Sequence, residues 1–137
     1  MKKIIKISAK GNTDIINITD KVSDFLKESK IKSGIMNIFS RHTTAGLAII
    51  ENETGAIQDF KETFEKIAPV NNPYNHNRIR NDNNGHAHIS TAMLGQSLTI
   101  PFEDNKLLLG TWQQIVFVDF DVQPRTREVI ITLIKGE

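Results

Sequence analysis

Short runs of isoleucine, valine and phenylalanine, separated by turn-forming residues, limit this chain to a fold built largely from β-strands. Runs of this composition, bounded by Gly, Pro, Asn or Asp, are typical of strands. The turn signal Gly11-Asn12 predicts that the first two runs form a hairpin. The predicted strands cover residues 2–8, 14–18, 35–39, 47–50, 97–102, 106–109, 112–120 and 128–134.

Helices are predicted between these strands. A stripe of apolar side chains at helical spacing predicts a core-facing helix over residues 56–68, which Pro69 ends. A second helix is predicted after a cap at Thr19 or Asp20, and a short third one over residues 89–94. The order predicts the α+β class: a two-layer α/β arrangement with a mainly antiparallel sheet and two or three helices packed on one face. The stripe consists of Ile57, Phe60, Phe64 and Ile67.

Length and composition narrow the class of protein. The 137 residues correspond to one domain, expected over residues 1–137. The absence of cysteine excludes disulfides and Cys-based metal sites and is consistent with a cytoplasmic protein. With 17 basic and 16 acidic residues, the chain has no broad field that would attract nucleic acid or an anionic membrane. No apolar run approaches the ~18 residues that span a bilayer.

The histidines suggest a metal site. Of four, three lie between residues 76 and 88. In an extended segment His86 and His88 would point to the same face, and His76 and Asp82 could add two more ligands. Imidazole and carboxylate ligands suit zinc, manganese or iron. The alternative is that the pair lies on a solvated loop or caps the helix that follows.

Several other polar residues are candidates with an ordinary alternative. The turn His42-Thr43-Thr44-Ala45-Gly46 can offer backbone N–H groups to an anion or simply join two strands. Glu51 is a ligand or general base, or it begins the next helix. If the segment is extended, Arg125 and Arg127 lie on the same face of the strand. There the two guanidinium groups would bind phosphate, or they would simply lie side by side on the surface.

Taken together, these motifs resemble the YjbQ family over nearly the whole chain. The resemblance rests on several short motifs that occur in the same order. They are His42-Thr43-Thr44-Ala45, Glu51-Asn52-Glu53, Tyr74-Asn75-His76-Asn77, Asp82 through Gly85-His86-Ala87-His88, Ala92-Met93-Leu94-Gly95, Pro101-Phe102, Leu109-Gly110-Thr111-Trp112-Gln113-Gln114 and Pro124-Arg125-Thr126-Arg127.

The resemblance implies a two-layer α/β fold, a homotrimer and a pocket near the subunit interfaces lined by histidines. It also implies a thiamine-phosphate synthase activity, a transferase reaction that joins a pyrimidine diphosphate to a thiazole phosphate and releases pyrophosphate, in some members as a side activity.

The leading hypothesis is therefore a metal-dependent enzyme that acts on a small phosphorylated metabolite. His76, His86 and His88 would hold a divalent metal. This metal would be zinc, manganese or iron, or magnesium if the substrate is a pyrophosphate. Catalytic roles are expected for His42, Thr43, Glu51 and Asp82, and phosphate binding for Thr44, Arg125 and Arg127. Two alternatives are a metal-dependent hydrolase of such a metabolite and a non-catalytic metabolite-binding module.

Overall fold

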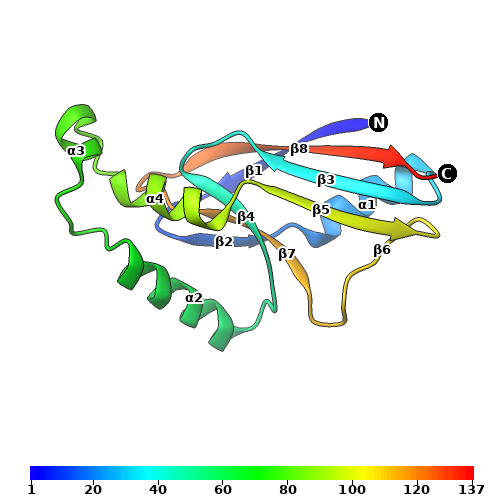
Figure 1. Cartoon of the computed structure of the whole chain (residues 1–137), viewed down its shortest axis with the longest axis horizontal. Coiled ribbons are helices and arrows are strands. Elements are labelled where there is room, and N and C mark those ends of the chain that lie inside the picture. The colour runs from blue at the N-terminus through cyan, green and yellow to red at the C-terminus, as the bar shows by residue number, and fades with distance from the viewer.

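A computed structural model describes residues 1–137 and contains eight strands and four helices (Figure 1). The strands are β1 (Lys2–Ala9), β2 (Asp14–Asn17), β3 (Gly34–Ser40), β4 (Ala45–Ile50), β5 (Ser97–Glu103), β6 (Lys106–Leu107), β7 (Gln114–Asp119) and β8 (Arg125–Lys135). The helices are α1 (Thr19–Ser29), α2 (Thr54–Ile67), α3 (Asn75–Arg80) and α4 (Gly85–Leu94). None of the four helices has the length and hydrophobicity that a membrane-spanning segment requires.

The strands form two antiparallel sheets. The larger sheet has the order β1-β8-β3-β5-β6, and the smaller has the order β2-β7-β4. Every paired strand is antiparallel to its neighbour, so the predicted α+β class with a mainly antiparallel sheet is confirmed. The division into two sheets was not predicted, because no local signal shows which strands pair across long stretches of chain.

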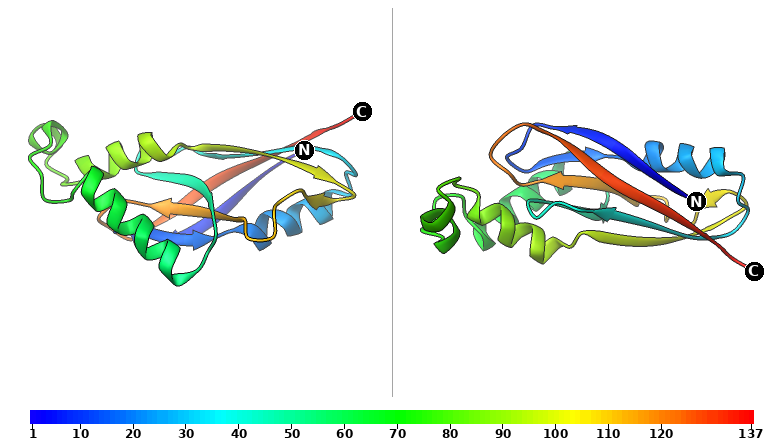
Figure 2. Two further views of the ribbon diagram at one scale, coloured as in Figure 1. Left: turned by 60° about the horizontal axis from the view of Figure 1, so that its bottom comes forward. Right: turned by 90° about the horizontal axis from the view of Figure 1, so that it is seen from above.

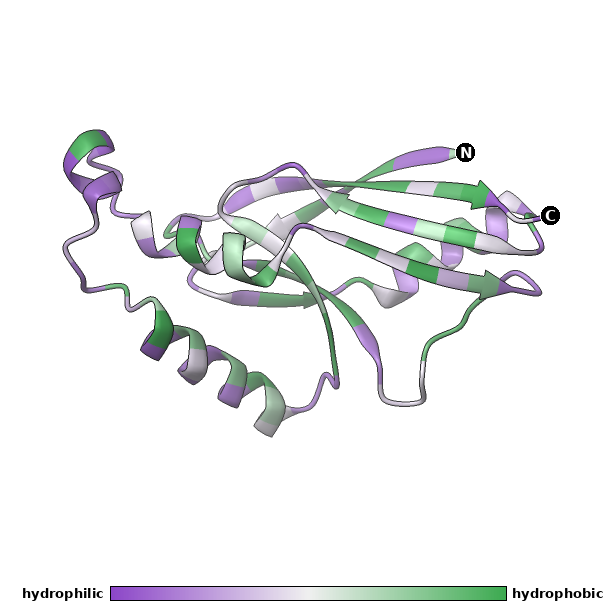
Figure 3. Ribbon diagram, viewed as in Figure 1, coloured by the Kyte–Doolittle hydropathy of each residue, from purple (hydrophilic) through white to green (hydrophobic).

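The small sheet lies between the large sheet and the helices α2 and α4 (Figure 2). Ile115 and Phe117 of β7 join the main core with the inner face of the large sheet and with α1. Val116 and Val118 lie on the opposite face of β7, where they pack in a second cluster with residues of α2 and α4. This double coverage explains why β7 reads as a continuous apolar run. Figure 3 shows such hydrophobic residues gathered along the strands, with hydrophilic residues at the turns.

The burial of helix residues agrees only in part with the sequence prediction. Val22, Phe25 and Leu26 of α1 recur at helical spacing and are buried. In α2 no residue is fully buried, because only Phe60 and Phe64 of the predicted stripe pack against Phe120, and Ile67 is 49% exposed. Helix α2 therefore lies loosely along the small sheet rather than sealing it.

Helix α4 is fixed by a close backbone contact. A Cβ atom on Gly46 of β4 would lie 2.5 Å from the carbonyl oxygen of Gly95, which ends α4, so only glycine allows this approach. The N–H of Leu47 donates a hydrogen bond to the same oxygen, at 3.0 Å. The contact holds α4 beside β4 and positions the histidines at its other end.

Candidate functional site

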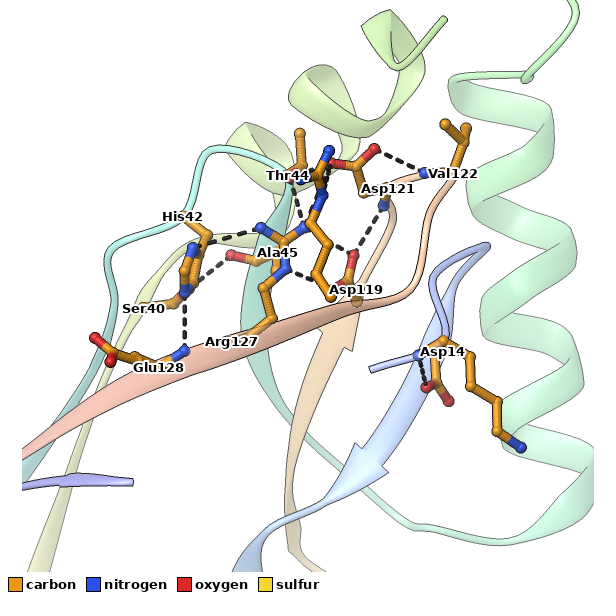
Figure 4. A network of polar contacts seen from close by, with 12 residues as sticks. Asp14, Ser40, His42, Thr44, Ala45, Asp119, Asp121, Val122, Arg127 and Glu128 are labelled. Carbon is orange, nitrogen blue, oxygen red and sulfur yellow. Dashed lines mark hydrogen bonds and ion pairs between the residues drawn. The ribbon is translucent and has the colours of Figure 1, made fainter. Parts of the chain in front are cut away.

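Two chain crossings between the sheets meet at one end of the molecule. Strands β3 and β8 belong to the large sheet, whereas β4 and β7 belong to the small one. Residues 41–44 connect β3 to β4, and residues 120–124 connect β7 to β8. Because Ser40 pairs with Val129 and Ala45 pairs with Asp119, both connections lie at the same corner (Figure 4). Polar residues from distant segments come together there.

A buried ion pair forms the centre of this corner. The Arg127 Nε atom lies 2.7 Å from Asp119 Oδ2, and Nη2 lies 3.1 Å from Oδ1, so the contact is bidentate. The two side chains are 7% and 0% exposed. Arg127 occupies the core-facing side of β8, and its charge requires a partner there.

Asp121 extends the network. Burial disfavours its charged form, but hydrogen bonds from the Val122 N–H, Thr44 and Asn84 together with the Arg125 charge lower the pKa of Asp121 overall. Thr44 Oγ1 donates to Asp121 Oδ2 at 3.0 Å and accepts from Arg127 Nη2 at 2.8 Å. Asp121 is therefore a carboxylate at neutral pH, held by neighbours on every side.

His42 faces a hydrogen-bond donor at each ring nitrogen. The backbone N–H of Glu128 donates to Nε2 at 3.0 Å, and Arg127 Nη1 lies 3.4 Å from Nδ1. Burial and then the charge of Arg127 lower the pKa of His42, so the ring is neutral at pH 7. A neutral imidazole has one acceptor nitrogen and one N–H. With Nε2 accepting from Glu128, Nδ1 carries the proton and faces another donor.

The His42–Arg127 contact is thus a pair of donors without an acceptor between them. The other polar atoms of the guanidinium, Nε and Nη2, already bond to Asp119, Thr44 and Asp121. Nη1 has no other partner than His42. An oxygen atom placed beside both N–H groups would satisfy them, as a phosphate or carboxylate oxygen does.

A second pair of imidazoles lies at the other end of the network. Asn84 Nδ2 donates to Asp121 Oδ1 at 3.3 Å, and Asn84 Oδ1 lies 2.9 Å from His76 Nε2. Asp82 Oδ1 is 3.1 Å from the same nitrogen. Because two oxygens face Nε2, the proton of His76 resides there and Nδ1 is a free acceptor. The ring of His88 lies 4.2 Å from that of His76, centroid to centroid, and burial followed by the charge of His76 lowers the pKa of His88.

The predicted pairing of His86 with His88 is wrong. Both residues belong to α4 rather than to an extended segment, and positions two apart on a helix point in nearly opposite directions. His86 is buried on the side of α2, away from the His76–His88 pair, and lines a cavity there. No three His, Asp or Glu groups are arranged to hold a metal ion.

The remaining predicted residues have different positions. Thr43 is exposed, whereas the hydroxyl of Thr44 is used inside the network. Glu51 follows the far end of β4, roughly 20 Å along that strand from the network, where it lines a small cavity with Trp112. Arg125 Nε lies 3.2 Å from Asp121 Oδ2, so the two arginines do share a face.

Sequence reasoning missed Asp119, Asp121 and Asn84. Asp119 ends the apolar run of β7 and Asp121 follows two residues later, and carboxylates at the end of a buried strand are a usable signal of a polar site. Their partner Arg127 lies on another sheet, which no local pattern shows.

The fold and this corner define a two-sheet α+β protein with a buried arginine–carboxylate network. The chain belongs to the family described as UPF0047 protein YjbQ-like, whose family model matches residues 3–136.

Known relatives span nearly the same length. A UPF0047 protein of Archaeoglobus fulgidus is 42% identical over 118 residues, covering 86% of this chain and 89% of the relative. The protein YugU of Bacillus subtilis is 36% identical over 135 residues, covering 97% and 98%. The crystal structure of a YbjQ-like protein of unknown function from Sulfolobus solfataricus superimposes with a TM-score of 0.93 at 30% identity, covering 99% of this chain and 97% of that one.

These comparisons overturn the predicted function, a metal-dependent thiamine-phosphate synthase. The matched family and these relatives are described as UPF0047 proteins or as proteins of unknown function, and none is named for that activity or for a metal. The physical basis of the prediction also fails, because the three imidazoles expected around one cation lie on two sides of α4.

Proposed function

We propose that this chain is an enzyme that performs acid–base chemistry on a small molecule, whose acidic group is held as its anion between His42 and Arg127. The observation that carries the proposal is the donor pair of His42 Nδ1 and Arg127 Nη1, 3.4 Å apart. His42 is only partly buried, so an oxygen can approach the pair from solvent. The matching anions are a carboxylate and a phosphate group, which was the group expected from the sequence.

The charge balance favours an anion of low charge. Arg125 and Arg127 contact Asp119 and Asp121, so the two positive groups are matched by two negative ones. The anion is therefore held by two directed hydrogen bonds rather than by a strong positive field. A singly charged oxygen group fits better than a phosphate dianion, because the nearby carboxylates repel a second charge.

His76 is the proposed proton acceptor. Asp82 and Asn84 fix its proton on Nε2 and leave Nδ1 as the base, which is the arrangement in which a third group orients a catalytic imidazole. Burial is the main cause that lowers the pKa of the neighbouring His88, so its ring is neutral at pH 7 and can exchange a proton with the substrate or with His76. Asn84 contacts both Asp121 and His76 and so links the two ends of the site.

The test is an untargeted assay of turnover. The purified protein is incubated with small-molecule extract from cells, and the metabolites are compared by mass spectrometry before and after. We expect the depletion of an acidic metabolite by the wild-type protein and its loss in His42→Ala and in His76→Ala. Arg41→Gln is the matched control, since Arg41 forms only an exposed pair with Glu128, at 3.1 Å, and should retain full activity.

Two results would refute the proposal. One is an extract left unchanged by the wild-type protein, and the other is depletion that His42→Ala sustains at the wild-type rate. A phosphorylated substrate among the depleted metabolites would support phosphate as the bound anion, and a carboxylic acid would support the alternative.

A homotrimer, implied by the family resemblance alone, and a bound divalent metal, expected from the histidines, remain proposals. Apolar side chains exposed on the outer face of the large sheet support association, and register places Ile4 and Phe39 on either side of Ile130. Light scattering of the purified protein tests the homotrimer, and elemental analysis tests the bound metal.

A further inference from the structure

A separate cavity of about 490 Å³ lies beneath α2. Its walls come from α2, from the turn between β1 and β2, and from the first turn of α4, which lie close together in Figure 1 and Figure 2. The volume is within the usual range of small-molecule sites, ~300–1,000 Å³. Helix α2 buries none of its residues fully, which leaves this space open between the helix and the body. The lining includes Asn12, Lys61, Glu62, Glu65, Lys66 and His86.

His86 is an unsatisfied group in the cavity wall. The residue is 4% exposed, and its Nδ1 is buried without a hydrogen-bond partner. Burial is the main cause that lowers the pKa of His86, so the ring is neutral and Nδ1 is either a donor or an acceptor. Buried polar atoms in folded proteins nearly always have a partner. The partner of Nδ1 is missing from the chain itself.

The charged residues of α2 that line the cavity form no ion pair, although Glu62 accepts a hydrogen bond from Gln58 Nε2 at 2.9 Å and Glu65 accepts one from the Val70 N–H at 3.4 Å. Lys61 with Glu65, and Glu62 with Lys66, are spaced four residues apart, at which ion pairs commonly form on helices. Neither pair forms, and no ion pair of the structure includes either lysine. Two ammonium groups and two carboxylates therefore line the cavity with no net charge.

We propose that this cavity binds a small zwitterion of the amino-acid type. Lys61 and Lys66 hold its carboxylate, Glu62 and Glu65 hold its ammonium group, and a polar atom of the ligand pairs with His86. The equal numbers of each charge select a molecule that carries both signs, since a simple anion or a simple cation would leave one pair of side chains facing a like charge. The site uses neither His42 nor Arg127, so it does not depend on the proposed function.

The experiment uses the whole chain and free amino acids. Each of the common amino acids is titrated into the protein, and thermal stabilisation and calorimetry measure binding. Acetate and methylammonium serve as single-charge probes. We expect at least one amino acid to raise the melting temperature, and both single-charge probes to bind at least tenfold more weakly. The double variant Lys61→Met/Lys66→Met should lose at least tenfold in affinity, whereas Lys21→Met, an exposed lysine of α1, should bind as the wild type does.

A direct observation of His86 complements the variants. In protein labelled with ¹⁵N at histidine, the ligand should shift the Nδ1 resonance of His86, and that of His42 should stay unchanged. His86→Phe should abolish binding, and the wild-type spectrum gives the answer if that variant does not fold. The proposal is overturned if no amino acid binds, if acetate binds as tightly, or if the lysine variant keeps its affinity. It is also overturned if binding leaves the His86 resonance in place.

Discussion

The buried ion pair of Arg127 with Asp119 predicts a large loss of stability in Asp119→Asn. The substitution keeps the shape of the side chain but leaves the guanidinium, in a side chain 7% exposed, without its bidentate carboxylate. Removing one partner of a buried pair costs about 3–5 kcal/mol. Asp121 Oδ2 remains 3.4 Å from Arg127 Nη2, so the loss should lie near the lower limit, about 3 kcal/mol.

Urea denaturation followed by circular dichroism measures this loss directly. Glu128→Gln is the control, because it converts a carboxylate to an amide in a surface pair whose side chains are 55% and 38% exposed. Such pairs contribute ~0–1 kcal/mol. The double variant Asp119→Leu/Arg127→Met should recover most of the stability, since it removes both charges. A loss in Asp119→Asn no greater than in Glu128→Gln would refute this reasoning.

Three further predictions concern other parts of the molecule. Gly85→Ala should lower the free energy of unfolding by about 1–3 kcal/mol, because its new Cβ would lie 2.5 Å from Tyr74 Cβ. Gly110→Ala is the control, since its Cβ would meet only the Gln113 side chain, at 3.3 Å. Equal stability of the two variants would contradict this prediction. Stability should fall as pH drops below 6.5, the ordinary histidine pKa, because three histidines have lowered pKa values and the unfolded chain therefore binds protons more readily. Urea midpoints across this range measure the slope, which His88→Gln should reduce, and a flat profile in the wild type would disprove the assignment. Phe39→Glu, on the exposed face of the large sheet, should convert a trimer into monomers by light scattering, and a monomeric wild type would reject that surface as an interface.

The strands were predictable because their signals are local. All eight predicted runs overlap observed strands, since β-branched residues and turn residues alternate clearly along the sequence. Helix α3 was missed because its six residues form no apolar stripe, and Ile79 is 80% exposed. The first turn of α4 has no helical signal in the sequence, because Gly85 and two histidines give no helical periodicity.

The site was predictable only as separate fragments. His42 and Arg127 are both singled out by the sequence, but their contact depends on the pairing of β3 with β8, which are distant in the sequence, and periodicity contains no such information. The same holds for Asp119, whose role follows from β7 belonging to one sheet and β8 to the other. The shared metal expected for His86 and His88 failed for a local reason, because a helix turns the two rings apart.

The tautomer of His42 tests the anion site most directly. In ¹⁵N-histidine spectra of the free protein at pH 7, the neutral ring should carry its proton on Nδ1, with Nε2 accepting from the Glu128 N–H. Titration with inorganic phosphate or acetate should then shift the Nδ1 resonance. A ring protonated at Nε2 instead, or a resonance that neither anion moves, would contradict the account, because Arg127 would then already be satisfied by the histidine itself.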